Sequence, residues 1–137
     1  MKKILNLQIF QLSRCGHLTL SLGLLLFTNF LFAQCDVAPY GIYPAATFTP
    51  IYSGSPEIIA TDSFAGEYSK VNILQHRQYV FTSSNPNDYI TVRNSTNILA
   101  FGQTPVTWNS NTTSGVINYY IHTNSSCGVE QIDRSEE

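Results

Sequence analysis

The chain has 137 residues, of which 43% are hydrophobic and 12% are charged, and its formal net charge is −2. This length allows one domain and excludes a nucleotide-binding α/β domain joined to a separate substrate domain. The first 34 residues hold three basic residues and no acidic one. The remainder holds four basic and nine acidic residues, a net of −5. That charge repels phosphate backbones and argues against nucleic acid as a partner.

Residues 1–34 have the three parts of a secretory signal peptide. Lys2 and Lys3 form a basic start, residues 18–32 form an apolar run, and Ala33 is a small residue at the exit. The sequence therefore predicts an exported protein, secreted or held at the cell surface, with the periplasm as the alternative compartment. It divides into a signal peptide at 1–34, a module at 35–133 and a charged C-terminal tail at 134–137.

Two other interpretations of this segment remain open, and both involve a membrane. A retained anchor needs about 20 apolar residues, whereas this run is shorter and is interrupted by Thr28 and Asn29. A lipoprotein signal would place an acyl chain on Cys35, but the preceding residue, Gln34, is not small. Contact with a membrane is otherwise not predicted.

The two cysteines of the mature chain, Cys35 and Cys127, lie near its two ends. An exported protein occupies a compartment in which disulfides persist, so the pair predicts a bridge that ties the ends together. Neither cysteine has a His at metal-ligand spacing, and no CxxC motif occurs, which argues against a metal or redox pair. Lipidation of Cys35 is the main alternative.

The mature chain shows alternating apolar and polar positions rather than helical periodicity. β-branched and aromatic residues alternate in short segments separated by Asn, Ser, Gly and Pro, and the predicted strands are 66–73, 78–83, 88–93, 98–101, 105–108 and 115–123. Short strands at such spacing predict an all-β fold, an antiparallel β-sandwich of jelly-roll type with about eight strands. The Pro- and Tyr-rich segment 38–44 is expected to run extended along a sheet edge.

Several longer strings resemble a known kind of module, and they lie at 55–72, 78–84, 88–92, 99–102 and 115–128. Together they resemble a Cys-framed β-sandwich module of secreted bacterial proteins associated with type IX secretion. The strand pattern is also similar to that of the pre-peptidase C-terminal domain, a non-catalytic sandwich appended to secreted hydrolases. The resemblance covers about residues 35–133. It implies a non-catalytic module that accompanies adhesion-type or accessory domains.

Two features depart from that resemblance. The module often carries a second cysteine pair, and Asp62 and Asp133 stand at the corresponding places. Two facing carboxylates would raise one pKa or attract a cation, but the simplest expectation is that the C-terminus splays into solvent. The second departure is the end of the sequence at Glu137, without the C-terminal sorting domain of type IX cargo. The chain then leaves the cell differently, stays in the periplasm or is part of a longer protein.

Residues able to support catalysis are few. There is no HExxH, P-loop, GxGxxG or GxSxG motif. Glu67 and Asp88 are the acids on which a hydrolase would depend, but Glu67 is expected to bond a neighbouring turn. His76 is expected in a solvated turn. The segment 85–88 offers oxygens for calcium without the acid spacing of a dedicated loop. No enzyme activity, metal or cofactor is therefore predicted.

The aromatic residues are the more informative feature, since all eight Tyr and the single Trp follow the signal peptide. Asn118, Tyr120 and His122 alternate on one face of the predicted strand 115–123. An exposed aromatic ring beside amide and imidazole groups is typical of a shallow sugar- or protein-binding face. The alternative is that these aromatic residues, with Trp108, pack in the core and at sheet edges.

The sequence thus favours a secreted or cell-surface, non-catalytic β-sandwich module that acts in adhesion or in binding a carbohydrate or protein ligand. The expected partner is a surface glycan or an extracellular protein. Two other functions remain as alternatives: a small secreted hydrolase that uses carboxylates, and an architectural spacer or fragment of a larger exported protein.

Overall fold

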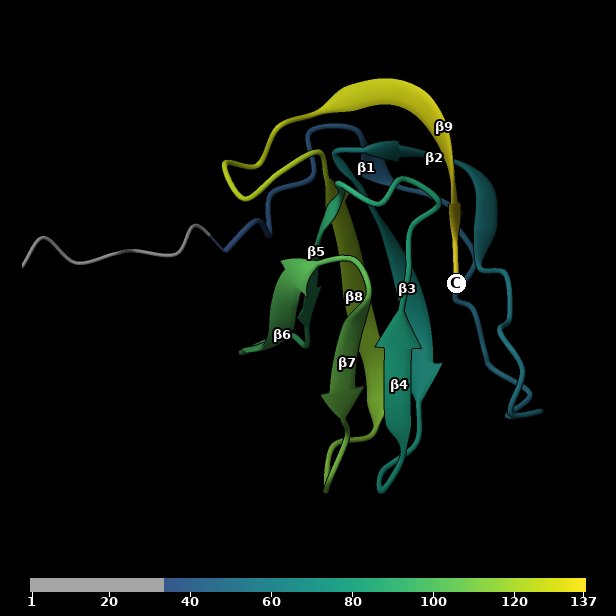
Figure 1. Cartoon of the computed structure of the whole chain (residues 1–137). Helices are drawn as coiled ribbons and strands as arrows, with labels where there is room; N and C mark the ends of the chain where they lie inside the picture. Colours follow the sequence, from purple (N-terminus) through teal and green to yellow (C-terminus); the bar gives the residue numbers. More distant parts are fainter. Residues whose placement is uncertain (1–33) are drawn as a thin grey trace, which may run out of the picture. The chain divides into compact units, whose positions relative to one another are not determined.

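The computed structural model of the chain describes residues 34–137 (Figure 1). The signal peptide predicted for residues 1–34 lies outside this range except for Gln34. No helix among the described residues is long and apolar enough to span a membrane.

The described part of the chain is all-β, as the sequence predicts, and contains nine strands and no helix. The strands are β1 (Gly41–Ile42), β2 (Ala60–Ala65), β3 (Glu67–Ile73), β4 (Gln78–Phe81), β5 (Tyr89–Arg93), β6 (Ile98–Gln103), β7 (Val106–Asn109), β8 (Gly115–His122) and β9 (Glu130–Glu136). β3 to β8 agree with the predicted strands to within two residues at each end. β1, β2 and β9 are the strands that alternation of apolar residues does not predict.

The larger sheet has the strand order β6-β5-β8-β3-β2-β9 (Figure 1). β8 lies near its centre and pairs antiparallel with β3 on one side and with β5 on the other. The hairpin between β5 and β6 closes at Asn94, whose side-chain oxygen accepts the backbone N–H groups of Thr96 at 2.9 Å and Asn97 at 2.7 Å. Asn favours such turns because its side chain bonds the backbone two residues further on.

The segment 40–48 runs along β3, as expected for a segment beside a sheet, but residues 43–46 bend and only β1 is extended as a strand. Tyr43 N donates to Tyr68 O at 3.0 Å, and Phe48 N donates to Lys70 O at 2.8 Å. β1 is parallel to β3, whereas the sequence predicts only antiparallel pairing. Parallel pairing requires a long crossover, and the chain between β1 and β3 provides it.

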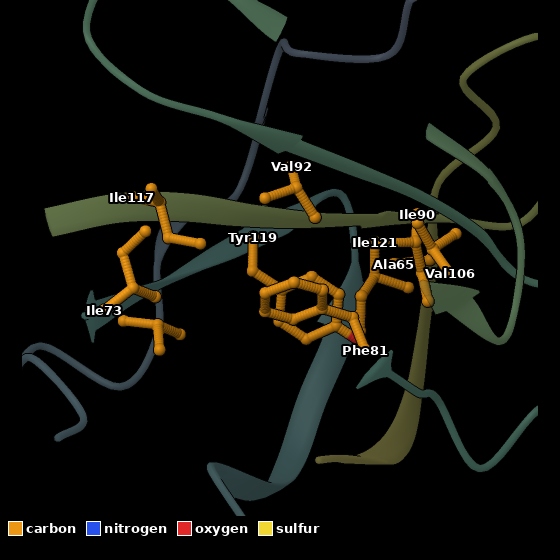
Figure 2. Packing of buried hydrophobic residues seen from close by; sticks show 10 residues of the cluster. Ala65, Ile73, Phe81, Ile90, Val92, Val106, Ile117, Tyr119 and Ile121 are labelled. Atoms are coloured by element: carbon orange, nitrogen blue, oxygen red, sulfur yellow. The ribbon is translucent and has the colours of Figure 1, made fainter. Parts of the chain in front are cut away.

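β4 and β7 form a second, two-stranded sheet that packs over one face of the larger sheet. The core lies between the two layers, where Figure 2 shows the Phe81 ring from β4 against the Tyr119 ring from β8. Their ring centroids are 5.3 Å apart. The same face of β8 contributes Ile117 and Ile121, which are buried together with Tyr119. The alternation in β8 therefore places its apolar side chains in the core, as expected for a strand with one face between two layers.

The predicted charged tail at 134–137 is wrong, because Glu130–Glu136 form β9 and the C-terminus does not splay into solvent. β9 pairs antiparallel with β2, and the side chains of Arg134 and Glu136 are buried. Charged residues are rarely buried unless they are paired, and both have partners here. The sequence pattern indicates a solvated tail because Asp88 and Ser69, which meet Arg134 and Glu136, lie far away in sequence.

The disulfide between Cys35 and Cys127 is confirmed. The two Cα atoms are 5.1 Å apart, and 92 positions separate the residues in the chain. The bridge fastens the start of the described chain to the turn between β8 and β9. Because the Cys35 sulfur is bonded to Cys127, it is not free to carry an acyl chain in this structure.

Candidate functional site

The predicted binding face of Asn118, Tyr120 and His122 lies on β8, opposite the core. The Tyr120 ring stacks on the Tyr68 ring with centroids 5.1 Å apart, and only 7% of Tyr120 is exposed. His122 has no exposed surface. The Asn118 amide donates to the Tyr120 hydroxyl at 3.2 Å. An external ligand therefore reaches little of this face beyond Asn118.

The N-terminal segment covers His122. Its Nε2 lies 2.9 Å from the backbone oxygen of Val37, so this nitrogen carries the proton and donates. Burial lowers the pKa of His122 below its usual value, and the bond to Val37 opposes that shift in part. A neutral, enclosed imidazole stabilises the N-terminal segment and is not placed to bind a ligand.

The two acids considered for hydrolysis are both withdrawn from the surface. The Glu67 carboxylate accepts a hydrogen bond from Phe64 N at 2.8 Å, which is the expected bond to a neighbouring turn. Asp88 is fully buried, and its Oδ2 lies 2.7 Å from Arg134 Nε. This pairing also removes Asp88 from any calcium loop at 85–88.

Asp62 and Asp133 are exposed on the paired strands β2 and β9. His76 is exposed in the turn before β4. Within residues 34–137, no group of three or more His, Cys, Asp or Glu side chains is placed to hold a metal ion.

A groove of about 440 Å³ lies beside β4. One wall is residues 77–82, which comprise β4 and its flanking residues, and the other wall is formed by residues 48–59. Val71 from β3 lies on the floor, and Glu137 lies at one end of the groove. Figure 1 shows that the chain around residues 50–57 runs beside β3 and β4 and that β9 ends nearby, at the C label. The groove is thus built from residues 48–59, from β3 and β4, and from the C-terminal residue of the described chain.

Glu57 holds the outer wall in shape. Its two carboxylate oxygens accept the backbone N–H groups of Ile51 at 2.8 Å and Tyr52 at 2.9 Å. These two bonds close the loop 51–57 and leave Tyr52 with a positive φ of 58°. Glu57 therefore has a structural role that engages both of its oxygens, although it lines the groove.

Aromatic side chains link the two walls. The Tyr79 hydroxyl lies 3.3 Å from the Tyr52 hydroxyl and accepts the backbone N–H of Leu74 at 2.8 Å. Burial, together with the hydrogen bond to Tyr79, raises the pKa of Tyr52 to about 12. The Tyr52 hydroxyl therefore remains protonated at neutral pH. Tyr79 also stacks on Trp108 of β7, with centroids 6.1 Å apart, so the inner wall is continuous with the core.

Arg77 provides positive charge at one end of β4. Its guanidinium carbon lies 5.6 Å from the centre of the Tyr52 ring, a cation–π arrangement. None of the ion pairs within residues 34–137 involves Arg77. The groove thus combines an apolar floor, aromatic walls and a cation without a carboxylate partner.

A second, more polar hollow lies near the end of β8. Its lining is Asn87, Tyr89, Gln103, Thr123, Asn124 and Ser125. Its volume is about 400 Å³, but Tyr89 is its only aromatic residue and it contains no charged side chain. Buried apolar surface with a few placed polar groups is typical of ligand sites, and the groove beside β4 fits that description better.

The sequence does not single out Tyr52, Arg77 and Tyr79 as a site. The concentration of Tyr after the predicted signal peptide is the one feature that points toward them, and it does not tell which tyrosines come together. Comparison with protein-family models, curated proteins and solved structures finds no match to this chain. The class that the fold defines is a disulfide-closed all-β domain with an aromatic groove.

Proposed function

We propose that the chain is a secreted or cell-surface, non-catalytic binding module that takes its ligand in the groove between β4 and residues 48–59. The observation that carries the proposal is the groove itself, with Tyr52 and Tyr79 on facing walls and Arg77 at one end. Aromatic rings and a weakly hydrated guanidinium are side chains that dominate binding sites.

The disulfide supports an extracytoplasmic location. Disulfides form and persist in secreted and periplasmic proteins and are rare in reducing compartments. The bridge Cys35–Cys127 closes a domain of about one hundred residues, a size at which such a staple contributes a large part of the net stability. An adhesion or accessory role, which the resemblance implies, requires this kind of stable module.

The two acidic side chains of the groove already have hydrogen-bond partners, which supports binding rather than catalysis. Glu57 uses both carboxylate oxygens to hold the loop. The other acid in the groove, Glu137, accepts the Thr82 hydroxyl at 3.4 Å. A general acid or base must have its reacting atom within hydrogen-bond reach of the substrate, and neither carboxylate is presented free of a partner.

Binding by the purified, oxidised protein tests the proposal. The probes are a glycan array and a synthetic peptide array, applied to the wild type, to Tyr52→Ala in the groove and to Tyr89→Ala in the second hollow. We expect a retained ligand that Tyr52→Ala loses and Tyr89→Ala keeps, with thermal unfolding showing that both variants fold. Silence of the wild type on both arrays, or binding that Tyr52→Ala leaves unchanged, would contradict the proposal and favour an architectural spacer.

The hydrolase alternative has a separate test. Chromogenic esters and glycosides are incubated with the wild type and with Glu57→Gln. We expect no turnover above the uncatalysed rate. Turnover that Glu57→Gln abolishes while the fold persists would replace a binding module by an enzyme.

A further inference from the structure

β4 has an edge that no strand of the described chain pairs with. Within residues 34–137 it pairs only with β7. Thr82, which directly follows β4, exchanges both backbone hydrogen bonds with Glu137, at 2.9 and 3.2 Å. Because backbone groups alternate in direction along a strand, the N–H and C=O of Val80 and Gln78 point to the same side as those of Thr82. That side is the groove.

The end of β9 sets the direction in which a strand would enter. β9 runs toward the end of β4 (Figure 1). The residues that follow β4 pair antiparallel with the end of β9, and the last hydrogen-bonded pair is Thr82 with Glu137. A strand that continues this antiparallel pairing lies opposite Phe81, Val80, Tyr79 and Gln78 in turn and runs toward Arg77. It occupies the groove and bonds the free backbone groups of β4.

The same register determines which side chains of the added strand face inward. Residues directly opposite each other in a sheet point to the same face. Phe81 is buried and Tyr79 packs against the core, whereas 51% of Val80 is exposed. The residue opposite Phe81 therefore meets the apolar floor near Val71, and the residue opposite Tyr79 meets the Tyr52 ring. The residue opposite Val80 faces solvent.

Charge selects the orientation of the added strand. Glu137 lies at the end of the groove where the strand begins, and Arg77 lies at the end where it stops. An antiparallel strand places its amino end beside the carboxylate and its carboxyl end beside the guanidinium. A parallel strand would reverse both contacts and bring like charges together.

We infer that the groove binds an extended peptide from another polypeptide, added antiparallel to β4, with apolar residues at alternate positions and a carboxylate at its C-terminal end. The inference rests on the proposed function and names the class of partner for that site. Main-chain bonds to an exposed strand edge supply affinity in this mode of recognition, and pockets for alternate side chains supply selectivity.

The probe is a series of five-residue synthetic peptides with a free amino group. The first and third residues are varied among apolar types, the second and fourth are Thr, and the fifth is Asp. Fluorescence anisotropy with the oxidised wild-type protein is expected to show saturable binding for part of the series. The reversed sequences serve as controls and are expected not to bind.

Two variants of Val80 and one modified peptide test the backbone hydrogen bonds between β4 and the added strand. Val80→Pro removes the N–H that faces the groove and is expected to weaken binding at least about tenfold, the effect of about one lost hydrogen bond. Val80→Thr keeps both the amide and the shape and is expected to stay within about twofold. N-methylation of the second peptide residue, opposite Val80, removes the partner group without altering the protein, so the test holds even where Val80→Pro fails to fold.

Arg77→Gln tests the charge at the far end. The variant is expected to weaken the peptide with a C-terminal Asp by about threefold to tenfold, the range for an exposed ion pair with some stacking. A peptide with Asn and a C-terminal amide in place of the acid groups is expected to bind both proteins equally. Equal losses for the two peptides would show that Arg77 acts only through the wall of the groove, and would overturn the charge assignment.

The outcomes separate this inference from the function on which it rests. A glycan held in the groove, with no peptide of the series bound, overturns the inference and leaves the binding module intact. If neither glycans nor peptides bind, both the inference and the proposed function are overturned. A dimer in analytical ultracentrifugation that Val80→Pro dissociates identifies a second copy of the chain as the occupant and also overturns the inference.

Discussion

Arg134 and Asp88 form an ion pair that is almost completely buried, with Arg134 Nε 2.7 Å from Asp88 Oδ2 and side-chain exposures of 1% and 0%. Arg134 also donates to Glu130, whose side chain is 42% exposed. The pair joins β9 to the loop that leads into β5. It accounts for the burial of a charged strand end that the sequence presents as a solvated tail.

Removal of the negative partner should leave the buried guanidinium without its main counter-charge. Asp88→Asn is expected to lower the free energy of unfolding by about 3–5 kcal/mol, since an unpaired buried charge is costly. The matched control is Asp62→Asn on the exposed face of β2, expected to change stability by less than about 0.5 kcal/mol. Urea unfolding measures both. Equal effects of the two variants would show that the buried pair is not a determinant of stability.

The disulfide should stabilise the domain chiefly by constraining the unfolded chain. With 92 positions between Cys35 and Cys127, the loop-entropy model gives about 4–5 kcal/mol. The double variant Cys35→Ser/Cys127→Ser is expected to lose about that amount in urea unfolding. Each single variant breaks the same bond and should match the double variant. A loss below about 1 kcal/mol would contradict the assigned role.

Glu136 should make the domain less stable as the pH rises from acid to neutral. Burial raises the pKa of Glu136 from 4.5 to about 7, although Ser69 and Ser63 hydrogen-bond the carboxylate and oppose the shift. Between these two pH values only the unfolded chain is ionised at this residue, so unfolding releases a proton and rising pH favours it. The loss amounts to about 3 kcal/mol and levels off above pH 7.

Comparison of the wild type with Glu136→Gln isolates that effect. His122, whose pKa burial lowers, acts in the opposite sense as the pH falls below 6.5, and it is present in both proteins. The difference in unfolding free energy between Glu136→Gln and the wild type is therefore expected to increase from pH 4.5 to pH 7. A difference that stays constant over this range would rule out a buried, neutral Glu136.

Gly66 should not tolerate a side chain, because its backbone φ is +106° and its surroundings are filled. A Cβ there would lie 2.8 Å from Val129 Cγ1 and 3.0 Å from Tyr40 Cδ2. Gly66→Ala is expected to cost about 3 kcal/mol, from backbone strain and overpacking together. Gly54, with φ of +82° and nothing within 4 Å, provides the control. Gly54→Ala retains the strain alone and is expected to cost about 1 kcal/mol in thermal unfolding. Equal losses of stability in the two variants would show that the side chains around Gly66 move to make room for a Cβ.

The strands that the sequence predicts are those whose burial follows from their own residues. β8 alternates Ile117, Tyr119 and Ile121 toward the core, and this local pattern is enough to identify it. The hairpin at Asn94 follows from the turn chemistry of that residue. The disulfide agrees with the prediction from two cysteines that lie near the two ends of the chain after the predicted signal peptide.

Whether the second face of β8 is open or covered could not be predicted from the sequence. Alternation correctly groups Asn118, Tyr120 and His122, but it does not reveal that the N-terminal segment covers them. Whether a sheet face is open or covered depends on a segment about 85 positions away, at Val37. No local pattern encodes that contact.

The sequence by itself determined the all-β class and six of the nine strands within residues 34–137, because periodicity and turn chemistry act over a few residues. It also favoured the disulfide between the two cysteines that follow the predicted signal peptide. Tertiary structure alone decided that β9 is a strand, since Arg134 and Glu136 are buried only where Asp88 and Ser69 meet them. Tertiary structure also decided which residues line the groove. Tyr52, Arg77 and Glu137 come together only after the sheets have packed, because side chains from distant segments meet through the path of the chain and not through its local pattern.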